Sequence, residues 1–229
     1  MFYITGDTHI PLDSGKLLPE NFKEGSMLDE NDYLIILGDF GGVWDNKSPE
    51  HKKWLDFLSS RRYTTLFIDG NHENFDILNS LDVDLFCGGK VHKVRDNVLH
   101  LMRGQVYNID GTKFFCFGGG FSRDRDRRLP HISWWQEEMP NDKEYEEGLK
   151  NLKENGYMVD YILTHTAPLS IISQFFLPFG ETKLNNYLSE IDRLVSYKKW
   201  YFGHVHKDEE IDDRHTALYE KIIELGENL

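Results

Sequence analysis

Short β-rich segments recur along this chain, and amphipathic stretches separate them. Each segment is rich in β-branched or aromatic residues, and most are followed by Gly, Asp or His. Short apolar runs that alternate with amphipathic ones predict layers of α-helix and β-sheet, that is, an α/β fold. The clearest strand candidates are Phe2–Thr5, Tyr33–Leu37, Thr64–Ile68, Lys113–Phe117, Tyr161–Leu163 and Trp200–Phe202.

Helix and turn signals fill several gaps between these strands. One helix is expected to begin at Ser48 as N-cap with proline in the first turn, and a second spans Asn141–Asn155 with Glu144 three residues after the cap. Between Val91 and Phe117, turn signals at close spacing predict some antiparallel pairing. The segment Ala217–Leu225 fits either a helix or a strand.

The 229 residues contain no repeat, no low-complexity tract and no flexible linker, which predicts one domain over residues 1–229. No run approaches the roughly 18 apolar residues of a membrane-spanning helix, and the first residues lack the pattern of a secretory signal. The two cysteines, Cys87 and Cys116, are expected to be reduced. These features predict a cytoplasmic protein without a membrane partner.

Two of the strand ends carry polar residues at i, i+2 spacing. Asp7 and His9 follow the first strand, and His204 and His206 follow the last. Because residues i and i+2 of an extended chain point to the same side, each pair could hold one metal ion. For Asp7 and His9 the alternative is a loop carboxylate beside an exposed histidine, and the pair alone does not decide between the two.

Three further strand ends finish in a polar side chain, namely Asp39, Asn71 and His165. Ligands of α/β proteins collect at the carboxyl ends of strands, so we expect these side chains to gather at one edge of a sheet. Together with the two pairs they make seven oxygen and nitrogen donors without a thiolate. Such a set suits two divalent ions, for example manganese, iron or zinc.

The motifs GDTH, GDFGG, GNHE, LTHTAP and GHVH occur in this order and span Thr5 to His206. Their order and content resemble the signature of the calcineurin-like metallophosphoesterases, and in particular the small phage and bacterial members. The resemblance implies two mixed β-sheets packed as a sandwich with helices on the outside. It further implies a catalytic His72, a first metal held by Asp7, His9, Asp39 and His206, and a second metal held by Asp39, Asn71, His165 and His204.

The sequence departs from the family pattern after Asp39. The carboxylate that orients the catalytic histidine in many members is replaced by Gly42, and Asp45 is a candidate to take its place. A purple acid phosphatase would carry tyrosine at position 42, so that branch is excluded. The phosphate-binding arginine of the pattern is missing as well.

A glycine turn and four arginines at positions 118–128 offer replacements for that arginine. Arg123 and Arg128 are the candidates for substrate binding, against the alternative of a solvated loop whose charges pair internally. For Arg125 and Arg127 the solvated loop is favoured. Trp134 and its neighbour at position 135 could stack on a base, although adjacent tryptophans are more often divided between core and surface.

The formal net charge of −13 disfavours long-range attraction of a polyanion, so nucleic acid is not an expected partner. Two divalent ions, two carboxylates and a hydroxide would leave the site at about +1, which attracts phosphate at short range. The predicted function is metal-dependent hydrolysis of P–O bonds in a small phosphomonoester, phosphodiester or nucleotide. The alternatives are a nuclease of the same superfamily and an inactive metal-binding scaffold.

Overall fold

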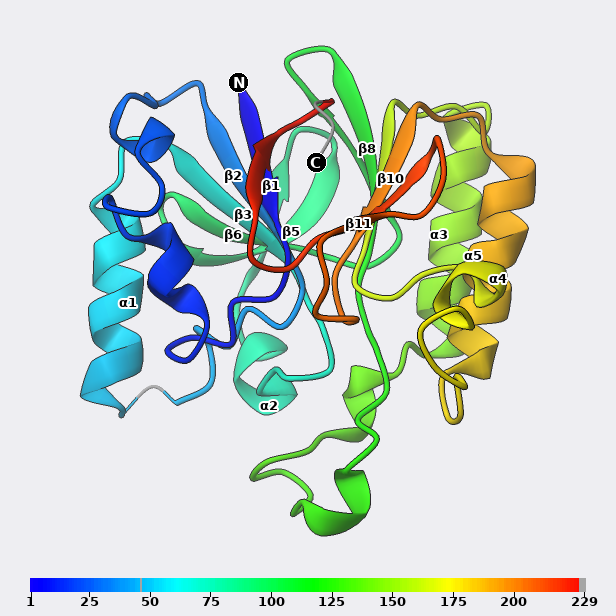
Figure 1. Ribbon diagram of the computed structural model, residues 1–229, viewed down its shortest axis with the longest axis horizontal. Coiled ribbons are helices and arrows are strands. Elements are labelled where there is room, and N and C mark those ends of the chain that lie inside the picture. The colour runs from blue at the N-terminus through cyan, green and yellow to red at the C-terminus, as the bar shows by residue number, and fades with distance from the viewer. Residues whose placement is uncertain (46, 227–229) are drawn as a thin grey trace.

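Two β-sheets form the centre of the molecule, as the computed structural model shows for residues 1–45 and 47–226 (Figure 1). The first sheet has seven strands in the order β13-β1-β2-β3-β6-β5-β4. Strands β1, β2, β3 and β6 of this sheet are mutually parallel, and both of its edges are antiparallel. The bounds are β1 Phe2–Thr5, β2 Tyr33–Leu37, β3 Thr64–Ile68, β4 Val83–Phe86, β5 Gly89–Arg95, β6 Val98–Leu101 and β13 Ile222–Glu224.

The second sheet has six strands in the order β11-β12-β10-β9-β8-β7. Strands β8, β9, β10 and β12 run parallel, and an antiparallel strand lies at each edge. The bounds are β7 Gln105–Ile109, β8 Thr112–Phe117, β9 Tyr161–Thr164, β10 Lys199–Phe202, β11 Glu209–Glu210 and β12 His215–Ala217.

Helices cover the outer face of each sheet (Figure 1). Helix α1 lies against the first sheet, whereas α3, α4 and α5 lie against the second, and the segment between β8 and α3 extends beyond the sheets. No helix among the described residues is long and apolar enough to cross a membrane. The bounds are α1 Pro49–Ser59, α2 Phe75–Leu78, α3 Asp142–Glu154, α4 Leu169–Ile172 and α5 Thr182–Leu194, with 3₁₀ turns at Ser14–Leu17, Glu24–Ser26, Arg125–Arg127 and Gln136–Glu138.

Apolar side chains from the facing sides of the two sheets form a shared core. Ile4, Ile35 and Leu66 come from the first sheet, and they belong to the same buried cluster as Phe114 and Leu163 from the second. Each fully buried side chain of this size contributes about 1.5–3 kcal/mol to stability. This core fixes the two sheets relative to each other, and it thereby fixes the loops that follow their strands.

The predicted α/β architecture of two mixed sheets flanked by helices is confirmed. Ser48 caps α1 by accepting from the backbone N–H of His51, and Asn141 and Glu144 form the expected capping box of α3. The ambiguous tail is extended, because its last strand pairs antiparallel with β1 and places Ile223 opposite Ile4. The pairing partner, which a local pattern does not reveal, decides between strand and helix here.

Candidate metal centre

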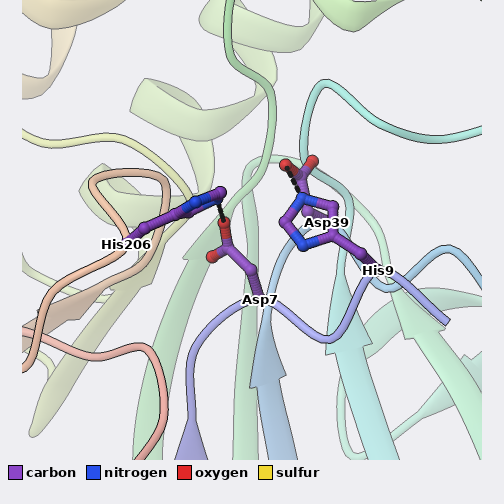
Figure 2. Close-up of side chains that lie close together, drawn as sticks. All are labelled: Asp7, His9, Asp39 and His206. Atoms are coloured by element: carbon purple, nitrogen blue, oxygen red, sulfur yellow. Dashed lines mark hydrogen bonds and ion pairs between the residues drawn. The ribbon is translucent and has the colours of Figure 1, made fainter. Parts of the chain in front are cut away.

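Four of the predicted metal-binding side chains converge at the carboxyl ends of β1, β2 and β10. Each offers one donor atom, and these atoms all lie within 4.8 Å of one another. His9 Nε2 lies 3.1 Å from Asp39 Oδ2, and His206 Nε2 lies 3.0 Å from Asp7 Oδ2 (Figure 2). This first cluster consists of Asp7, His9, Asp39 and His206.

Two neighbours orient the histidines of the first cluster. His9 Nδ1 lies 2.7 Å from Asp13 Oδ2, and this hydrogen bond directs Nε2 toward Asp39. Metal-binding histidines commonly use their second ring nitrogen in this way. The half-exposed ring of His206 stacks on Tyr219, with ring centroids 4.6 Å apart. Both imidazoles therefore present Nε2 to the carboxylates.

The other predicted ligands lie on the opposite side of Asp39. His165 Nε2 is 3.4 Å from Asp39 Oδ1 and 3.2 Å from Asn71 Oδ1. His165 Nδ1 donates to the Leu37 carbonyl oxygen at 2.8 Å, and the amide nitrogen of Asn71 donates to Ser122 Oγ at 3.3 Å. These hydrogen bonds leave Nε2 of the histidine and the oxygen of the amide facing each other. The second cluster consists of Asp39, Asn71, His165 and His204.

His204 is the fourth member of the second cluster. Its ring centroid lies 4.8 Å from that of His165, and its backbone N–H donates to Asp7 Oδ1 at 2.9 Å. The buried Nε2 lies 3.3 Å from Glu181 Oε2 but makes no hydrogen bond. Asp7 Oδ2 is also buried without a hydrogen bond, although it is ion-paired with His206 Nε2 at 3.0 Å. Buried polar atoms without hydrogen bonds are costly, and metal ions would satisfy both atoms.

Backbone conformation brings the donors this close. His9, Asp39, His204 and His206 all have positive φ, with values of 35°, 45°, 66° and 51°. Such conformations are rare for residues other than glycine and concentrate at functional sites. Gly70 is required for a different reason, because a Cβ there would overlap the carboxylate and the backbone nitrogen of Asp39.

Glu73 holds the loop that carries Asp39. Its carboxyl is fully buried and accepts from the backbone N–H groups of Phe40, at 2.7 Å, and Gly41, at 3.3 Å. Burial and the nearby charge of Asp39 raise the pKa of Glu73 to about 8. Glu73 therefore acts on the loop backbone and lies outside both clusters.

The carboxylates in the two clusters raise the pKa values of neighbouring histidines. Burial alone would lower the pKa of His165, but the carboxylates of Asp39 and Asp7 raise it to about 10. Burial opposes protonation of His9 as well, yet its contact with Asp39 raises the pKa to about 9. In the metal-free protein these imidazoles hold protons in the place where a cation would bind.

His72 borders the clusters, and its ring contacts an arginine. Its backbone N–H donates to Asp39 Oδ1 at 2.7 Å, while Arg128 Nη1 lies 2.9 Å from His72 Nδ1. Burial and the charge of Arg128 lower the pKa of His72, against the opposing effect of Asp39. Asp45 does not take the role expected of it, because it is exposed and accepts from the Lys47 backbone N–H.

The other arginines at positions 118–128 are exposed, and the two neighbouring tryptophans differ in burial. Arg123 is exposed and lies over the ring of Phe176, with its guanidinium carbon 3.4 Å from the ring centroid. Arg125 and Arg127 are exposed, which agrees with the solvated loop. Trp135 is buried while Trp134 is only partly so, and this is the expected division between core and surface.

Sequence reasoning missed three residues at this site. Glu181 beside His204 and Asp13 beside His9 follow no strand end and carry no motif. Lys16 is buried beneath the first cluster and donates to the carbonyl oxygen of Asp7 at 2.7 Å. A buried lysine is unusual enough to be informative in a structure, but its burial leaves no trace in the local sequence.

Comparison with known proteins places this geometry in a family. No curated protein matches the chain by sequence. A crystal structure named "Putative 5'-Nucleotidase" from Staphylococcus aureus, in complex with alpha-ketoglutarate, matches with a TM-score of 0.52 and 15% identity. The match covers 95% of this chain and 48% of the other, so this chain spans about half the length of that structure. The model of the calcineurin-like phosphoesterases matches residues 1–208, and the chain belongs to this family.

Proposed function

We propose that this protein hydrolyses phosphoric esters with two divalent metal ions, one in each cluster, and that Asp39 bridges them. The convergence of Asp7, His9, Asp39 and His206 within 4.8 Å is the observation that carries the proposal. Asp7 Oδ2 and His204 Nε2 support it, because both are buried without a hydrogen bond and both can donate an electron pair to a metal.

Bound metal ions would lower the pKa of a water molecule and neutralise charge on the phosphoryl group. Their charge also explains how an acidic protein attracts an anionic substrate, since the overall net charge is −13. Manganese, iron and zinc all suit oxygen and imidazole donors, and we propose manganese for the first trials.

Arg128 supplies the positive charge that the family pattern places elsewhere. Its Nη1 lies 2.9 Å from His72 Nδ1, and its Nε pairs with Asp124 Oδ1 at 2.7 Å. The guanidinium is thus held beside His72, where it can donate to a phosphate oxygen. Arginine only donates hydrogen bonds, and Arg128 lies nearer to Nδ1 of His72, at 2.9 Å, than to Nε2, at 3.5 Å. We therefore propose that Nδ1 accepts and that the ring proton of the neutral imidazole sits on Nε2. We propose that this N–H stabilises the departing oxygen of the ester.

Several features favour a small phosphorylated substrate over a nucleic acid. Apart from the buried Lys16, the positive side chains described near the site are a few arginines in one loop, and they do not form a broad basic stripe. The name of the Staphylococcus aureus structure supports nucleotides among these candidate substrates. An inactive scaffold is disfavoured because all seven donor positions and His72 are filled. The free thiols of Cys87 and Cys116 fit the proposed cytoplasmic location.

The test is hydrolysis of p-nitrophenyl phosphate and bis(p-nitrophenyl) phosphate before and after exhaustive chelation. Chelation is expected to abolish hydrolysis, and Mn²⁺ is expected to restore it more effectively than Mg²⁺, which prefers to keep water ligands. Full activity in a sample without detectable metal would refute the proposal.

A further inference from the structure

Two cavities open on either side of His72 and Arg128. The first, which we call the phosphate cavity, measures about 370 Å³ and is bordered by Asp39, Asn71 and His204. The second, which we call the ring cavity, measures about 450 Å³. Both volumes suit parts of a small molecule. His72 and Arg128 line both cavities, so they form the partition between them.

The ring cavity differs in chemistry from the phosphate cavity. Its wall includes Trp44 and the consecutive residues Ile10, Pro11 and Leu12. No carboxylate lines it among the residues that the structure describes. An apolar wall with an indole suits a flat, uncharged ring, since stacking on an aromatic side chain tolerates any ring with a π-face.

The ring cavity is also preformed. Trp44 packs edge to face against Trp135, with ring centroids 5.3 Å apart, and its carbonyl oxygen accepts from Asn74 Nδ2 at 2.8 Å. His51 lies in the same wall and donates through Nε2 to the Ile10 carbonyl oxygen at 3.2 Å. Its Nδ1 is buried without a hydrogen bond.

We propose that the ring cavity binds the alcohol part of the substrate and selects an alcohol that carries a flat aromatic ring. This inference rests on the proposed function, which puts the phosphoryl group in the phosphate cavity. The ester oxygen that joins the two parts must then pass the partition, beside His72. In hydrolysis, the water oxygen bonds to phosphorus, the P–O bond to the alcohol breaks, and the alcohol leaves with a proton.

The experiment compares two phosphomonoesters whose alcohols have similar acidity, 2-(1-naphthyl)ethyl phosphate and ethyl phosphate. The readout is the ratio of their kcat/KM values in the Mn²⁺-loaded protein. We expect the naphthyl ester to be favoured by about tenfold, within the range that stacking on an aromatic side chain contributes. The ratio should fall toward one in Trp44→Ala.

Two substitutions at exposed leucines keep the test valid if Trp44→Ala does not fold. Leu12 lines the ring cavity and is 82% exposed, whereas Leu85 on β4 is 77% exposed and lies outside both cavities. The ratio should fall in Leu12→Ser and stay unchanged in the matched control Leu85→Ser. A wild-type ratio near one, or the same ratio in the wild type, Trp44→Ala and Leu12→Ser, would overturn the inference.

A binding measurement separates this inference from the proposed function. If the metal-loaded wild type hydrolyses neither ester, the proposed function fails, and the cavity is then judged by saturation-transfer NMR with 2-(1-naphthyl)ethanol and metal-free protein. A signal with the wild type that is lost with Trp44→Ala supports a ring-binding cavity. No signal with the wild type would overturn it.

Discussion

Loading metal onto the metal-free protein should release protons, and the number of protons follows from the structure. The carboxylates of Asp39 and Asp7 raise the pKa of His165 to about 10 against the effect of burial, and Asp39 raises that of His9 to about 9. At pH 7 both imidazoles are therefore protonated. A metal ion needs their free electron pairs, so each must give up its proton when both clusters are filled.

The size of the effect is set by these two protons. Each released proton makes the apparent binding constant rise tenfold per pH unit, which corresponds to about 1.4 kcal/mol. Filling both clusters should thus become about a hundredfold more favourable between pH 7 and pH 8. The increase should weaken above pH 9, where His9 has lost its proton, and again above pH 10. Unperturbed histidines, with a pKa near 6.5, would give no such rise above pH 7.5.

Titration calorimetry in buffers of different ionisation enthalpy counts the released protons directly. The wild type should release about two protons at pH 7.5 from these histidines when Mn²⁺ fills both clusters. His9→Ala should release one fewer, while His131→Ala, which removes an exposed histidine paired with Asp76, should match the wild type. Metal binding without proton release, at an affinity that is constant from pH 7 to pH 9, would refute the reasoning.

Five substitutions test individual roles. Asp39→Asn should lose metal or most activity because a neutral oxygen must then hold two ions. Glu73→Gln should lose less of either. Equal losses in the two variants would show that the bridging role of Asp39 is misassigned. Arg128→Ala should lower kcat/KM at normal metal content and raise the pKa of the His72 ring in NMR titration. Arg123→Ala tests the second candidate arginine. Unchanged kinetics in both variants would show that the segment is only a solvated loop. His72→Ala should slow alkyl esters by about 10²–10⁴-fold and spare esters of acidic phenols; equal losses for both ester types would make His72 a stabiliser of other phosphate oxygens.

The sequence predicted six strands of the two sheets well because each of these six is a short apolar run with a polar end. In β1 the run Phe2–Thr5 stops at Gly6 and Asp7, and in β10 the run ends before Gly203. A change from apolar to polar residues within two positions marks both the buried strand and the exposed edge. The parallel arrangement then brings these ends together, which is why the candidate ligands could be named in advance.

Contacts between distant segments could not be predicted in the same way. The contact of Arg128 with His72 joins residues 56 positions apart, and the sequence suggested only Arg123 and Arg128 as candidates for substrate binding. Glu181 comes close to His204 because the segment before α5 folds over the site. Such contacts depend on how loops pack on one another, and neither periodicity nor a local motif records that packing.

The number and position of bound metal ions test the dinuclear site most directly. Crystals grown with Mn²⁺ and measured on both sides of the manganese absorption edge would locate the ions by their anomalous scattering. We predict two peaks per chain, one in the first cluster and one in the second, with the Asp39 carboxylate between them. One peak, or peaks only at other places such as the exposed pair of His131 and Asp76, would contradict a dinuclear centre.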